Sequence, residues 1–152
     1  MTPVASRWFF LILAAIGAIA ALIPWGYASR RQITQSGLDH AWAGWREAGL
    51  VDYDLRVRHE AHGKKSEAHV RVRGGQEREV VRDGEFVNTR TAGLTVDDFF
   101  AKLEVLLSAK TQSDYLTADF HPNLGFPVRL VWRPKEGIRE EWVLKLDDVK
   151  GR

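Results

Sequence analysis

The first hydrophobic pattern in the chain is an unbroken one. Residues 8–29 contain no charged side chain, and most of them are apolar. A helix over this segment places Trp8 and Trp25 about 26 Å apart along its axis, close to the hydrocarbon thickness of a bilayer, about 30 Å. The pattern therefore predicts a single transmembrane helix within residues 1–30, with Trp8, Trp25 and Tyr27 at the two membrane interfaces.

Small residues recur along this predicted helix, at Ala14, Gly17, Ala18 and Ala21. Because small side chains let another helix approach closely, they predict packing against other membrane-protein subunits as well as contact with membrane lipid. The segment contains no His, Asp, Glu, Lys or Arg between its flanking arginines, so it lacks the usual axial ligand for haem and any proton relay. We therefore expect it to anchor and pack.

A cleaved signal peptide is the alternative interpretation of the same segment. Arg7 then supplies the basic region, and Gly26, Tyr27 and Ala28 precede a cleavage site before Ser29. The apolar stretch exceeds the usual length of about 7–15 residues, which favours a retained helix. The basic residues on its two sides nearly balance, so charge leaves the orientation of the helix open.

Further along the chain, the apolar positions recur at spacings of three and four, as in amphipathic helices. The first such set is Leu38, Ala41, Trp42 and Trp45, and the second is Val96, Phe99, Phe100, Leu103, Leu106 and Leu107. Ser36 and Asp39 resemble a capping box for the first helix, and Gly49 is a natural stop. Thr95 and Asp98 have the same arrangement at the start of the second helix.

Alternation of apolar and polar residues predicts strands in the remaining segments. The apolar positions of the first two strands are Tyr53, Leu55, Val57, Ala68, Val70 and Val72, and further strands are expected at residues 79–82, 85–89, 115–120, 128–132 and 141–146. Asp83-Gly84 predicts a hairpin with a type I′ turn, which requires positive φ.

These elements predict an α+β fold class, with an N-terminal single transmembrane helix followed by an antiparallel β-sheet packed against about two helices. The corresponding domains are a transmembrane anchor at residues 1–30, a juxtamembrane linker at 31–37 and an extramembrane domain at 38–152.

The composition of the chain excludes several classes of function. The first 35 residues hold three arginines and no acid, and the remaining 117 residues hold 19 Lys and Arg against 20 Asp and Glu. The folded domain is therefore near neutral, which argues against a nucleic-acid partner. The chain has no cysteine, which excludes disulfides and thiolate chemistry.

Several short motifs follow one another along the chain. They are Trp42 and Trp45, Tyr53-Asp54-Leu55-Arg56-Val57, Arg82-Asp83-Gly84, Thr95-Val96-Asp97-Asp98-Phe99-Phe100, Asp119 and Leu124-Gly125-Phe126-Pro127. In this order they resemble a family of uncharacterised bacterial envelope and lipoprotein domains, over residues 38–147. The resemblance implies a periplasmic or external domain held at the membrane, and it implies no chemistry. We expect the inner membrane, with the C-terminal domain on its periplasmic side. Members commonly carry a cysteine pair and a lipid-modified cysteine, which this chain lacks.

Candidate chemistry is sparse. His59, His62 and His69 come nearest to a metal-binding pattern, but an extended chain separates ligands at these spacings. Asp97 and Asp98 are explained by helix capping, and Asp119 with His121 by the adjacent turn. We therefore predict no catalytic, cofactor-binding or metal-binding residue and no cofactor.

Four arginines form the strongest charged pattern. Arg56, Arg58, Arg71 and Arg73 occupy outward positions on the first two strands, where guanidinium groups are candidates for contact with a partner or an anion. Acidic residues nearby favour instead a solvated, partly neutralised face.

The function that follows is that of a non-enzymatic, single-pass membrane protein, an accessory or scaffolding subunit of a larger complex such as an energy-transducing one. A periplasmic ligand-binding or sensor domain is the first alternative, and it requires a pocket between sheet and helices. A hydrolase that uses His59 or His121 is the second.

Overall fold

A computed structural model describes residues 32–87 and 93–149 of the chain. These residues form two helices, α2 (Gln35–Ala48) and α3 (Val96–Ala109). The strands are β1 (Tyr53–Ala61), β2 (Lys64–Arg73), β3 (Gln76–Arg82), β4 (Glu85–Phe86), β5 (Tyr115–Phe120), β6 (Pro127–Arg133) and β7 (Glu140–Val149).

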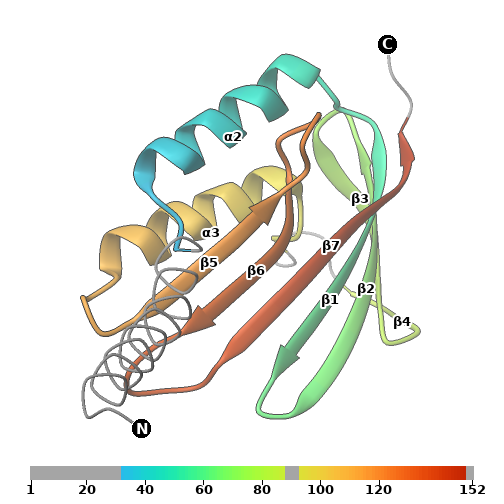
Figure 1. Cartoon of the computed structure of the whole chain (residues 1–152). Helices are drawn as coiled ribbons and strands as arrows, with labels where there is room; N and C mark the ends of the chain where they lie inside the picture. Colours follow the sequence, from blue (N-terminus) through green and yellow to red (C-terminus); the bar gives the residue numbers. More distant parts are fainter. Residues whose placement is uncertain (1–31, 88–92, 150–152) are drawn as a thin grey trace, which may run out of the picture. The chain divides into compact units, whose positions relative to one another are not determined.

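The strands form one seven-stranded antiparallel sheet in the order β4-β3-β2-β1-β7-β6-β5. The first four strands are joined in chain order, and β7 pairs with both β1 and β6, which joins this group to the β5–β6 hairpin. Both helices lie across the same face of the sheet, and the β1–β2 hairpin extends beyond them (Figure 1). The opposite face, which we call the open face, carries no helix of the described residues.

Tight turns connect the first four strands. The central dipeptides are His62-Gly63, Gly74-Gly75 and Asp83-Gly84, and all six residues have positive φ, between 50° and 88°. Two positive φ values define the type I′ turn, whose twist matches that of the flanking strands. The hairpin predicted at Asp83-Gly84 is therefore confirmed. The first hairpin turns at the two residues His62-Gly63, which leaves Lys64 and Lys65 in β2.

The hydrophobic core lies between the helices and the sheet. From the helices it takes Leu38, Ala41, Trp45, Val96, Phe99, Phe100 and Leu103, and from the central strands it takes Tyr53, Leu55, Val57, Val70, Val72, Leu130, Trp142 and Leu144. Directly opposed residues share a face of an antiparallel sheet, as Leu55 does with Val70 on β2 and Leu146 on β7. The alternation read from the sequence therefore chose the buried face correctly.

The predicted fold class is wrong in its first part, the transmembrane helix. In residues 32–87 and 93–149, no helix is long and apolar enough to cross a membrane. Each of the two helices there has 14 residues, which spans about 21 Å against a hydrocarbon core of about 30 Å, and each buries only one stripe against the sheet.

The residues on which the membrane helix was predicted lie outside those that the structure describes. They include the interface residues Trp8, Trp25 and Tyr27 and the packing residues Ala14, Gly17, Ala18 and Ala21.

The start of α2 also differs from the prediction. Thr34, and not Ser36, is the N-cap, and its hydroxyl accepts a hydrogen bond from the Gly37 N–H at 3.2 Å. Ile33 before the cap and Leu38 four positions after it both belong to the core, the positions of a hydrophobic staple. Burial of Ile33 favours Thr34 as the N-cap, because a helix capped at Ser36 would lose the staple between Ile33 and Leu38.

Candidate functional site

Residues from several of the sequence motifs meet in the core. The Trp45 ring on α2 contacts Tyr53 edge-on at 5.5 Å between centroids and Phe126 at 6.2 Å. The Tyr53 hydroxyl accepts a hydrogen bond from the N–H of Val96 at the start of α3, at 3.2 Å. Burial raises the pKa of Tyr53 to about 12. These motif residues therefore stabilise the junction between both helices and the sheet.

The segment ahead of β6 packs directly on α2. Gly125 has φ 74°, and a Cβ atom there would overlap the backbone of Ala41 and Trp45. His121 stabilises this turn, because its Nδ1 accepts a hydrogen bond from the Leu124 N–H at 3.2 Å and its ring stacks on Phe126. His121 is thus engaged in the turn, and among the described residues no hydrogen bond joins it to Asp119.

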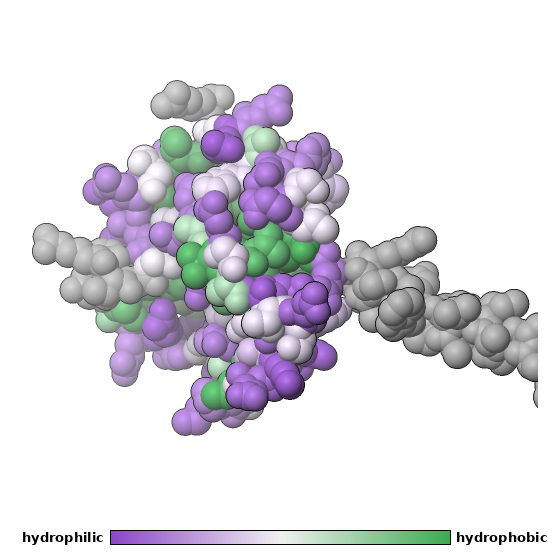
Figure 2. All heavy atoms as spheres, turned by 90° about the vertical axis from the view of Figure 1, so that its left-hand side faces the viewer, coloured by the Kyte–Doolittle hydropathy of each residue, from purple (hydrophilic) through white to green (hydrophobic). Residues whose placement is uncertain are grey.

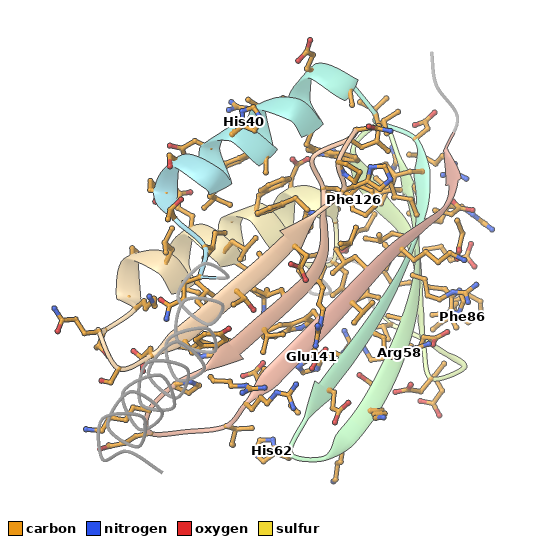
Figure 3. The ribbon with its side chains drawn as sticks, viewed as in Figure 1. His40, Arg58, His62, Phe86, Phe126 and Glu141 are labelled. Atoms are coloured by element: carbon orange, nitrogen blue, oxygen red, sulfur yellow. The ribbon has the colours of Figure 1, made fainter. Side chains whose placement is uncertain are left out.

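The three histidines weighed as metal ligands are separated. His59 lies on the helix-covered face, opposite Ser66, whereas His69 lies on the open face, opposite Arg56. His62 is at the tip of the β1–β2 hairpin (Figure 3). Among the residues described here, no three metal-binding side chains come together.

The four arginines do share the open face, and each is paired with an acid. The shortest nitrogen–oxygen distances join Arg56 to Asp147 (3.0 Å), Arg58 to Glu67 (3.4 Å), Arg71 to Glu79 (2.6 Å) and Arg73 to Asp54 (2.8 Å). Pairing consumes much of their capacity to attract an anion. Their role as partner or anion contacts stays a prediction, and their internal pairing weakens the case for an anion.

A cleft of about 240 Å³ lies on the other face, where the β1–β2 hairpin extends past α3. We call it the Trp142 cleft. Its apolar wall is formed by Val57, Ala68, Leu94, Phe99 and Trp142, and its polar residues are His59, Ser66, Arg82, Lys102 and Glu140. Strand register explains the assembly: His59 is directly opposite Ser66 on β2 and Trp142 on β7.

Aromatic and charged groups contact one another inside this cleft. The His59 ring stacks on the Trp142 indole at 4.8 Å and 13° between planes, and His59 Nε2 lies 3.3 Å from Glu140 Oε2. The Lys102 ammonium lies 4.6 Å from the centre of the same indole, within the range of a cation–π contact. Trp142 therefore holds both a histidine and a cation in place.

The contacts do not form a catalytic triad. Ser66 faces His59 across the strand pair, but within the described part of the chain no hydrogen bond joins the two side chains. A serine nucleophile needs a hydrogen-bonded base to take its proton.

The carboxylate of Glu77, on β3, lies near the start of α3. The Glu77 carboxylate accepts a hydrogen bond from the Leu94 N–H, and Leu94 belongs to the wall of the Trp142 cleft. Burial raises the pKa of Glu77, with repulsion from Asp98 acting in the same direction. Glu77 therefore positions one side of the cleft through the backbone.

Sequence reasoning singled out His59 and missed the other polar residues of the cleft. His59, Ser66, Arg82 and Glu140 come from four strands, and Lys102 comes from α3. The available signal was the strand parity of His59, which shares the inward positions of Tyr53, Leu55 and Val57. A polar residue at an inward-facing position of a strand indicates where the helices no longer cover the sheet.

The remaining surface is mixed in character. On the side formed by β5 and the ends of the helices, a small group of hydrophobic atoms is surrounded by hydrophilic ones (Figure 2). Elsewhere, Phe86 projects from β4 with 80% of its surface exposed (Figure 3). An aromatic side chain this exposed at the edge of a sheet is a candidate for contact with another protein.

A family model, that of a family of unknown function (DUF6174), matches residues 37–150. The match confirms the expected membership in a family of uncharacterised domains. Neither a curated protein nor a solved structure matches the chain. The envelope location that the resemblance implies stays a prediction.

Proposed function

We propose that this chain, which belongs to the DUF6174 family, is a non-enzymatic binding protein whose Trp142 cleft holds a small molecule. The observation that carries the proposal is the cleft itself, in which an apolar wall adjoins a few convergent polar groups. Ligand sites in proteins have this composition, with apolar walls for affinity and polar groups for orientation.

Packing elsewhere in the domain supports the choice of this cleft. Along the same face, Leu55, Val70 and Leu130 are each at most 2% exposed, so the sheet is covered by side chains there. Beyond α3, neither of the two described helices covers the sheet, while the inward-facing positions continue through His59 and Ser66. A hollow with polar groups at the end of a filled core favours ligand binding over a purely structural role.

The test is a screen of small molecules against the full-length chain, followed by the indole N–H signal of Trp142 in nuclear magnetic resonance spectra. Ser66→Leu places an apolar side chain in the cleft and is expected to abolish binding. Lys65→Leu adds the same side chain one position away on the open face and should leave binding unchanged. Equal effects of the two variants, or no binder for the parent chain, would contradict the proposal.

A second candidate function is that of an accessory or scaffolding subunit that makes protein–protein contacts. Phe86, 80% exposed at the edge of the sheet, is the observation that favours it, since aromatic residues are enriched where proteins bind each other. Phe86→Ser should lower the yield of a cross-linked partner, whereas Val105→Ser on α3 should not. If neither variant lowers the yield of the cross-linked partner, this edge of the sheet is not the contact.

A further inference from the structure

We infer that the Trp142 cleft selects a compact monocarboxylate with an apolar body. The inference rests on the proposed function and specifies the ligand of that same site. Three features carry it: two cations that have no acidic partner among the described residues, one acid that limits the total charge, and an adjoining apolar wall.

The two cations are Arg82 and Lys102. Among the described residues, neither forms an ion pair with a carboxylate, in contrast to the arginines of the open face. They reach the cleft from different elements, Arg82 from β3 and Lys102 from α3. Lys102 is also held over the Trp142 indole, so its ammonium is placed before a ligand arrives. Positive groups arranged in this way bind an anion most readily.

Charge balance within the cleft favours a monoanion. Arg82 and Lys102 contribute two positive charges, and Glu140 contributes one negative charge beside His59. The charges of Arg82, Lys102 and Glu140 together leave one excess positive charge, which a single carboxylate neutralises. A doubly charged phosphate would leave a negative excess and would be repelled by Glu140.

The wall of the cleft requires an apolar part in the ligand. Val57, Ala68 and Phe99 are buried core residues that reach the cleft, so an inorganic anion would leave this surface in contact with water. At about 240 Å³, the cleft lies below the usual range for drug-sized ligands, about 300–1,000 Å³. A short aliphatic or monocyclic carboxylate fits both limits.

The experiment titrates the full-length chain with hexanoate, its uncharged counterpart hexanamide, and inorganic phosphate, followed by the Trp142 indole signal. Hexanoate should bind about tenfold more tightly than hexanamide, the usual effect of one charge-assisted contact. Lys102→Gln and Arg82→Gln should each weaken hexanoate binding severalfold and leave hexanamide unchanged. Arg58→Gln, on the open face, is the matched control and should have no effect.

The outcomes separate this inference from the proposed function. Equal binding of hexanoate and hexanamide would overturn the monocarboxylate assignment while preserving the cleft as a ligand site. Tighter binding of phosphate than of hexanoate would also overturn it, in favour of a bare anion. If no compound in the wider screen perturbs Trp142, the proposed function itself fails.

Discussion

Gly125 brings the turn before β6 against α2, and no other residue type fits there. Its φ of 74° lies in the left-handed region, and the added Cβ would overlap the Ala41 carbonyl. The sequence marked this position only as part of a turn, because a contact between residues 84 positions apart leaves no local pattern. The resemblance through Leu124-Gly125-Phe126-Pro127 is therefore explained by packing, not by chemistry.

Gly125→Ala should lower the free energy of unfolding by about 3 kcal/mol or more, because backbone strain and overlap with α2 add. Gly63→Ala is the control, since its φ is 71° but no atom lies within 4 Å of the added Cβ. We expect a loss of about 1–2 kcal/mol for that variant. Urea denaturation measures both, and equal losses would show that the α2 contact is unimportant.

At the scale of elements, the sequence predicts correctly those elements that a local pattern specifies. It does not predict those that depend on pairing between distant residues. Helix α3 was predicted with its cap, because Thr95 and Asp98 form a capping box within four residues, and β5 was predicted over its full length. β2 begins at Lys64, ahead of the predicted Ala68, because residues 64–67 lack alternation and are ordered by pairing with β1. The Trp142 cleft was not predicted, since its polar groups come from four strands and a helix.

Asp114 links two connections between elements. Its carboxylate accepts hydrogen bonds from the N–H and hydroxyl of Thr111 and from the N–H of Lys135, at 2.7–2.8 Å. These bonds lower the pKa of Asp114 below its usual 3.8. A lowered folded-state pKa stabilises the domain above the unfolded-state value, and this contribution is lost as the pH falls through 3.8 toward the folded-state value.

Asp114→Asn should therefore destabilise the domain at pH 7, with the difference from the parent chain shrinking below about pH 4. Urea denaturation between pH 7 and pH 3 measures this difference. Asp119→Asn, on an exposed part of β5, is the control and should change stability little at any pH. A constant difference for Asp114→Asn across the range would contradict the role assigned to its charge.

At the scale of the whole molecule, β7 determines whether the sheet is one unit. It pairs with β1 along nine residues and with β6 along four. Leu144 on this strand is 3% exposed and lies directly opposite Val57, so its side chain belongs to the shared core of both groups of strands.

Leu144→Ala should cost about 2–5 kcal/mol in unfolding free energy, because it leaves a cavity at the centre of the core. Val143→Ala, one position away on the open face with Val143 37% exposed, should change stability by no more than about 0.5 kcal/mol. Thermal unfolding followed by circular dichroism compares the two. A small effect of Leu144→Ala would mean that the two groups of strands fold independently.

The position of β7 also governs how this domain is made. During synthesis β1 and β6 emerge from the ribosome before the strand that separates them, and each then presents an unpaired edge. Exposed edges of this kind recruit other chains. Until the segment that follows Arg139 has been added, the sheet cannot close and these two edges stay open to pairing with other chains.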